Sequence, residues 1–129
     1  MEEKKKITSF TDLKAWQAGH ELALLIYKIT RQYPREEQFG LTNQLRRAVV
    51  SITSCIAEGF SRRSMKEKIQ FYSMALGSLS EVQNQLLLSK DLDYLSKNDF
   101  DNLAEKSIIV SKLLNGLIKS SESKISIKN

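Results

Sequence analysis

Residues 41–70 have the sequence LTNQLRRAVVSITSCIAEGFSRRSMKEKIQ and combine two features that decide the fold. Residues 48–57 contain no charged side chain, while their apolar residues recur at helical spacing. Both flanks are basic, and the stretch carries six basic and two acidic side chains, a net +4 of the chain's +5. The pattern predicts a helix that is buried on more than one side, with positive charge near its two ends.

Length and composition favour a single helical domain. The chain has 129 residues, enough for one modest core, and it has only one proline and five glycines for turns. The single cysteine, Cys55, excludes an internal disulfide framework and fits a reducing compartment. The N-terminus lacks the apolar core of a signal peptide, and no apolar stretch reaches membrane-spanning length. We expect a cytoplasmic protein with no membrane partner.

Four helical segments are predicted, each with an apolar row at three- and four-residue spacing. Their expected ranges are residues 9–34, 41–59, 64–92 and 96–119. Ser64 with Glu67, and Ser96 with Asp99, have the spacing of helix N-terminal caps. Gly59 is expected to close the second helix, and Gly77 to permit a close helix approach inside the third.

Short connections between these segments predict an all-α, up-down-up-down antiparallel four-helix bundle. Residues 1–8 are expected to form a flexible N-terminus, residues 9–119 the bundle domain, and residues 120–129 a polar C-terminal tail. In the second helix the expected inward row is Leu41, Leu45, Ala48, Ile52, Cys55 and Ile56.

The opposite face of the second helix predicts self-association. It presents small or uncharged side chains where a helix at the surface of a monomeric bundle would carry polar ones. We therefore predict a homo-oligomer, since a second copy would cover this face. The candidate interface residues are Val50, Thr53, Ser54, Ala57 and Phe60.

The basic residues are candidates for binding RNA or DNA phosphates. Arg62, Arg63, Lys66 and Lys68 surround the turn between the second and third helices. Arg46 and Arg47 lie four to five helical turns away, so one continuous patch is not expected. The alternative is that these side chains are solvated, or form salt bridges with Glu58, Glu67 and Glu81.

The sequence does not favour an enzyme. A di-iron bundle needs a Glu-x-x-His motif from each of two helices, whereas this chain has one histidine, His20, preceded three residues earlier by Gln17. Glu58 and Glu81 are expected to pair with arginine or to cap helix ends, and Cys55 to act as a small apolar filler. The aromatics, Phe39 and Phe60 among them, are expected to be core or interface anchors. We therefore predict no catalytic residue, no metal ligand and no cofactor.

An ordered series of residues resembles the four-helix bundle proteins encoded in intervening sequences of 23S rRNA genes. The similarity covers about residues 9–119 and is carried by Phe10, Asp12, Leu13, Trp16, Gln17, Phe39, Gly40, Leu41, Thr42, Gln44, Leu45, Arg46, Arg47, Ala48, Ser51, Ile52, Ile56, Ala57, Glu58, Gly59, Phe60, Arg62, Ser64, Ala75, Leu76, Gly77, Ser78 and Glu81. Two positions depart from the usual pattern: Thr53 replaces a common proline, and Cys55 replaces a common asparagine.

The resemblance implies a homopentameric ring of bundles and does not imply an enzyme. Relatives include the accessory variability determinant of diversity-generating retroelements, a basic bundle that associates with a reverse transcriptase and with nucleic acid. Two main hypotheses stay open. The ring binds RNA or DNA through its basic surfaces, as an accessory to a nucleic-acid enzyme such as a reverse transcriptase, or it is a protein-protein adaptor without nucleic acid. A metal-binding bundle enzyme is a third and less favoured alternative.

Overall fold

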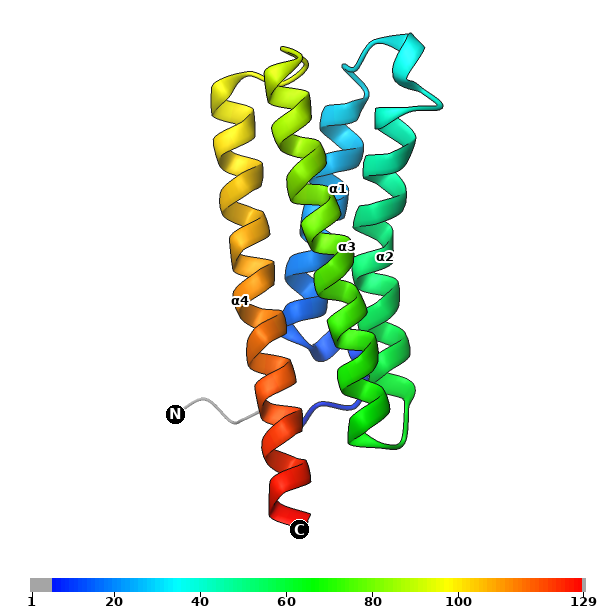
Figure 1. The fold of residues 1–129 in the computed structure, drawn as a ribbon, viewed down its shortest axis with the longest axis vertical. Helices are drawn as coiled ribbons and strands as arrows, with labels where there is room; N and C mark the ends of the chain where they lie inside the picture. Colours follow the sequence, from blue (N-terminus) through cyan, green and yellow to red (C-terminus); the bar gives the residue numbers. More distant parts are fainter. Residues whose placement is uncertain (1–5, 129) are drawn as a thin grey trace.

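The protein is a four-helix bundle in the computed structural model, which describes residues 6–128. This part of the chain contains no strand. Its helices are η1 (Phe10–Asp12), α1 (Lys14–Thr30), η2 (Arg35–Glu37), α2 (Leu41–Ser61), α3 (Met65–Asp91) and α4 (Lys97–Lys128). Figure 1 shows the four long helices side by side, with the α2–α3 turn at one end and the other two connections at the opposite end. The predicted all-α class and number of long helices are confirmed.

Each long helix packs against two others. α2 contacts α1 and α3, and α4 contacts α1 and α3, so the four helices enclose one core. The predicted inward rows fill that core: Leu45, Ile52 and Ile56 of α2 are fully buried. Other fully buried side chains come from all four helices: Leu22, Ile26, Val49, Tyr72, Ala75, Leu79, Val82, Leu86, Val110 and Leu114. No helix within residues 6–128 is long and apolar enough to cross a bilayer.

Two of the helix starts are capped as the sequence predicts. The Glu67 amide donates to Ser64 Oγ over 3.1 Å at the start of α3, and the Asp99 amide donates to Ser96 Oγ over 3.1 Å near the start of α4. Each serine satisfies an amide that has no partner inside its helix. These caps fix where the chain turns back into the bundle.

Glu37 links two connections at the same end of the bundle. One carboxylate oxygen accepts a hydrogen bond from the Leu41 amide at 3.1 Å. Glu37 thus caps the start of α2, because the N-cap residue, Gly40, has no side chain that could do so. The other oxygen accepts from the Tyr94 hydroxyl at 2.9 Å, in the α3–α4 connection. This hydrogen bond raises the pKa of the Tyr94 phenol, and burial and the nearby negative charge of Glu37 raise it further. One carboxylate thus stabilises the entry to α2 and holds the α3–α4 turn against it.

The glycines do not have the roles that the sequence predicted. Gly59 does not close α2, which continues to Ser61. A Cβ at Gly59 would lie 2.7 Å from Tyr72 Cε1 and 3.0 Å from Phe71 Cβ, so Gly59 permits the close approach of α2 to α3. A Cβ at Gly77 would meet nothing within 4 Å, so the close approach predicted there is wrong.

The C-terminal segment is also different from the expected polar tail. α4 remains helical through Lys128, and in Figure 1 its end extends past the α2–α3 turn. Ser121 is buried and its hydroxyl donates to the Leu117 carbonyl over 2.9 Å. At the other terminus, residues 1–5 of the expected flexible segment lie outside the described residues. Thr8 is held by hydrogen bonds from its amide and hydroxyl to Asp12 Oδ2.

Candidate functional site

The α2–α3 turn gathers basic side chains at one end of the bundle. Lys68 makes contacts within the bundle. Its Nζ donates to the Phe60 carbonyl over 2.6 Å and lies 5.3 Å from the centre of the Phe60 ring. Burial lowers the pKa of the Lys68 ammonium, and the positive charge of Lys124 lowers it further. Lys124, on the last turns of α4, therefore adds to the positive potential at this end.

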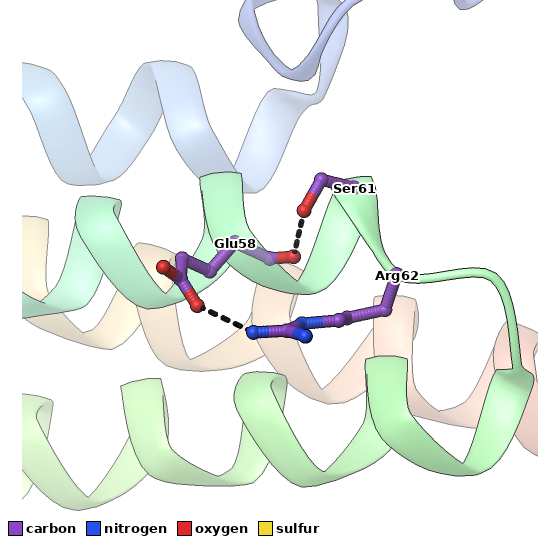
Figure 2. Close-up of polar contacts among 3 residues, drawn as sticks. All are labelled: Glu58, Ser61 and Arg62. Atoms are coloured by element: carbon purple, nitrogen blue, oxygen red, sulfur yellow. Dashed lines mark hydrogen bonds and ion pairs between the residues drawn. The ribbon is translucent and has the colours of Figure 1, made fainter.

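Arg62 is partly occupied by contacts within the chain. Its Nη2 atom lies 3.0 Å from Glu58 Oε2, and its guanidinium carbon lies 4.6 Å from the centre of the Phe71 ring. Figure 2 shows this ion pair beside the hydrogen bond from the Ser61 hydroxyl to the Glu58 carbonyl. Both charged side chains are exposed, so the pair contributes little to stability. The predicted alternative, in which an arginine pairs with Glu58, is correct for Arg62.

Arg63 and Lys66 complete the basic end, and both are exposed. Within residues 6–128 neither side chain forms a hydrogen bond or an ion pair. Their charges, with those of Lys68 and Lys124, are available to an anion. We define Arg62, Arg63, Lys66, Lys68 and Lys124 as the basic end.

Lys124 was not among the predicted basic residues because a polar tail was expected after residue 119. The signal was present in the heptad row of α4. Ser107 is a buried serine of that row, and Ser121 follows it by two heptads and is also buried. The row therefore continues beyond residue 119 and carries Lys124 close enough to Lys68 to affect its pKa.

Arg46 and Arg47 have different roles although they are adjacent. Arg46 Nε donates to Thr30 Oγ1 over 2.9 Å, Arg46 Nη2 donates to the Tyr27 carbonyl over 3.4 Å, and its guanidinium carbon lies 4.8 Å from the centre of the Tyr27 ring. Arg46 thus holds the C-terminal end of α1. Arg47 is exposed and makes no such contact among the described residues. Sixteen residues of α2 separate Arg46 from Arg62, about 24 Å along the helix axis.

The residues of the predicted subunit face of α2 differ in their exposure. Val50 and Ser54 are exposed, and they line a groove of about 520 Å³ together with Tyr27 and Arg47. Thr53 is half-buried because it faces α1, where its Cγ2 would lie 3.1 Å from a Cβ at Gly19. Ala57 and Phe60 are also half-buried, and Phe60 packs against the core. The contact of Phe60 with the core agrees with its expected role as an anchor, and a place for Thr53 and Phe60 in a subunit interface stays a prediction.

A second groove lies between α2 and α3 and is mainly polar. Its volume is about 520 Å³, and the groove is lined by Phe39, Asn43, Gln44, Arg47, Ala48, Ser51, Ser78, Glu81 and Gln85. The Ser78 hydroxyl donates to Ser51 Oγ over 2.9 Å and so joins the two helices. We call this the α2–α3 groove.

Phe39 stands at the α2–α3 groove and is 89% exposed. Of the two roles expected for Phe39, that of a core anchor is therefore wrong, and that of an interface anchor stays a prediction. This exposure is not predictable from the sequence, because helical periodicity does not indicate where a side chain in a connection between helices points.

The residues considered for catalysis have structural surroundings. The His20 ring stacks on Trp16 with centroids 4.7 Å apart, and Cys55 Sγ lies 3.9 Å from Ser51 Oγ. No group of three or more His, Cys, Asp or Glu side chains that could hold a metal ion occurs in residues 6–128. Glu81 is exposed and, in this part of the chain, forms neither of the pairings expected for it.

The chain is similar to a solved structure and to a known protein family. The fold is similar, with a TM-score of 0.73, to a 1.70 Å crystal structure of a protein of unknown function from the S23 ribosomal protein family of Bacteroides thetaiotaomicron VPI-5482. The two chains are 24% identical over 81% of this chain and 98% of that one, so this likeness establishes the fold alone. No curated protein matches the sequence. The family model of the 23S rRNA-intervening sequence protein matches residues 11–116, most of the chain, and the protein therefore belongs to that family.

Proposed function

We propose that the protein is a non-enzymatic, oligomeric four-helix bundle that binds RNA or DNA through basic surfaces. The bundle follows an up-down-up-down course, and copies of it assemble into a ring of five, as the family resemblance implies. The observation that carries the proposal is the basic end, where Arg63 and Lys66 form no ion pair within residues 6–128. A ring would repeat this surface around its axis.

The electrostatics of the basic end support an anionic partner. Lys68 and Lys124 are close enough for the charge of one to lower the pKa of the other, so a phosphate there would relieve like-charge repulsion. The basic end gathers five cationic side chains, and among them only Arg62 forms an ion pair with a described carboxylate. Lysine and arginine side chains bind phosphates in this way without reading sequence, at an affinity that falls steeply with salt.

Exposed apolar side chains support self-association. Leu24 and Val50 are 60% and 41% exposed on α1 and α2, and Leu87 and Ile108 are 48% and 50% exposed on α3 and α4. Leu87 and Ile108 also line an apolar groove between α3 and α4. A ring built from head-to-tail contacts needs two different faces on each copy. The α1–α2 face and the α3–α4 face are two such surfaces.

The nucleic-acid proposal is tested by pairing two double variants with the same change in charge. Arg63→Ala with Lys66→Ala removes charge from the basic end, whereas Lys97→Ala with Lys112→Ala removes the same charge from exposed positions elsewhere on α4. Fluorescence anisotropy with structured RNA is measured as a function of salt. We expect weaker binding for the first variant only, with the salt slope reduced by roughly one for each phosphate that is no longer neutralised. Equal binding by the two variants at every salt concentration would contradict the proposal.

The adaptor hypothesis is supported by different observations. Arg46 is used within the chain, by Thr30 and Tyr27, and Arg62 is partly neutralised by Glu58. The apolar α3–α4 groove could instead receive a protein partner such as a reverse transcriptase. An oligomer that purifies with a protein-like ultraviolet spectrum before any high-salt wash, and that binds no RNA or DNA at low salt, would favour the adaptor.

A further inference from the structure

We propose that the α2–α3 groove binds a nucleotide whose base carries an exocyclic amino group, with the base stacked on Phe39. The proposal rests on the proposed nucleic-acid function but assigns the base to a different surface. Arg47 of the groove and Arg63 of the basic end are sixteen residues apart on α2 and just beyond it, about 24 Å along the axis. The two surfaces can therefore be tested separately.

Phe39 supplies the aromatic platform. Its side chain is 89% exposed, although the two residues that follow it are hydrogen-bonded back to Glu37. The Gly40 amide donates to the Glu37 carbonyl over 3.0 Å, and the Leu41 amide donates to the Glu37 carboxylate over 3.1 Å. An exposed aromatic ring on a fixed backbone is what single-stranded nucleic-acid binding proteins use, because every base has a face that can stack on it.

The chemistry of the lining favours a polar ligand over a second copy of the chain. The cores of subunit interfaces are apolar and depleted in charge. Here the groove that Phe39 lines is also lined by two amides, Asn43 and Gln44, and by side chains of opposite charge, Arg47 and Glu81. Arg47 forms no hydrogen bond or ion pair within residues 6–128, so its guanidinium is available to the phosphate of a stacked nucleotide.

Two acceptors on α3 determine which bases fit. The ionised Glu81 carboxylate can only accept hydrogen bonds, and no described donor occupies it. Gln85 also lines the groove, and its Oε1 atom is buried without a hydrogen-bond partner. The terminal torsion of a glutamine is soft, so this oxygen can turn toward a ligand. Adenine, cytosine and guanine each bring an exocyclic amino group with two N–H donors, enough for both acceptors, whereas uracil has only its single ring N3–H on the pairing edge.

The experiment uses Phe39→Trp in the full-length protein. The chain has one natural tryptophan, Trp16, which is half-buried against His20, so the unsubstituted protein provides the background signal. Short oligomers of A, C and U, and the free nucleotides AMP, CMP and UMP, are titrated while tryptophan emission is followed. We expect saturable quenching, with an affinity that is at least several-fold higher for A and C than for U. Quenching by strands alone identifies a nucleotide within RNA, and quenching by AMP and CMP as well extends the site to free nucleotides.

Phe39→Ala and the control Ile109→Ala are then compared by anisotropy with labelled oligo(A). Both remove an exposed apolar side chain, but Ile109 lies on α4, outside the groove. Loss of a stacked base is expected to weaken binding by roughly fivefold or more for Phe39→Ala only. Equal binding by both variants, or quenching that does not distinguish A from U, would overturn the proposal.

Two further outcomes separate this inference from its neighbours. A fall in oligomer mass for Phe39→Ala without nucleic acid would overturn it in favour of a subunit contact. Failure of the proposed function is recognised differently, through the double variant Arg63→Ala with Lys66→Ala. If that variant binds RNA like the unsubstituted protein while Phe39→Trp is quenched selectively, the groove is supported and the basic end is not.

Discussion

Gly59→Ala should destabilise the bundle, whereas Gly77→Ala should stabilise it. Both glycines lie inside helices, where alanine is intrinsically better by about 1 kcal/mol. At Gly77 a Cβ meets nothing within 4 Å, so the full gain is expected. At Gly59 it would lie 2.7 Å from Cε1 of Tyr72, a ring only 2% exposed and therefore unable to swing away. Overpacking of this kind costs about 1–3 kcal/mol, which leaves a net loss of about 1 kcal/mol.

The measurement is chemical and thermal denaturation followed by circular dichroism at several protein concentrations, since self-association would add to apparent stability. Thermal midpoints should move in opposite directions for the two variants, by roughly 4 °C per kcal/mol. A Gly59→Ala protein as stable as the unsubstituted one would refute the steric argument. Destabilisation by Gly77→Ala that disappears on dilution would show that a second copy occupies the space beside α3.

Three further predictions concern individual side chains. Ser64→Ala should lower the free energy of unfolding by about 1 kcal/mol because the α3 cap is removed, measured by thermal denaturation. Arg46→Ala should destabilise by about 1 kcal/mol because it releases the end of α1, while urea denaturation of Arg47→Ala should show no change. The hydrogen bond to Glu37 raises the pKa of Tyr94 in the folded protein. The contribution of this hydrogen bond to the free energy of unfolding is therefore complete below the pKa of an unfolded tyrosine, near 10, and is lost as pH rises through the pKa of the folded state. The free energy of unfolding should therefore fall less steeply at alkaline pH for Tyr94→Phe than for the unsubstituted protein. An equally steep fall in both proteins would contradict this.

The sequence predicted the elements that depend on local periodicity and on short-range hydrogen bonds. Ser64 with Glu67, and Ser96 with Asp99, are caps because their partners are three residues away on the same helix. The inward rows were also correct, since a helix that buries one stripe repeats that stripe in its sequence. Fold class follows from these local signals.

The features that sequence analysis missed depend on contacts between distant segments. A glycine near a helix end is typical of a stop signal, but Gly59 is required by Tyr72, thirteen residues further along the chain on another helix. Charge counting could not show that Arg46 is engaged by Tyr27 and Thr30 while Arg47 is exposed. Both arginines have the same local pattern, and only the packing of α1 against α2 distinguishes them.

The hydrogen bonds of Glu37 determine how the α1–α2 and α3–α4 connections unfold locally. Its carboxylate joins segments 57 residues apart in sequence, so the α1–α2 and α3–α4 connections should open as one cooperative unit in hydrogen exchange. Phe39 lies on that unit, two residues after Glu37. Its backbone is therefore ordered when the chain folds, before any partner arrives. A partner that binds at Phe39 therefore does not have to order a loop and avoids the entropy loss of doing so, which is the advantage of a preorganised site.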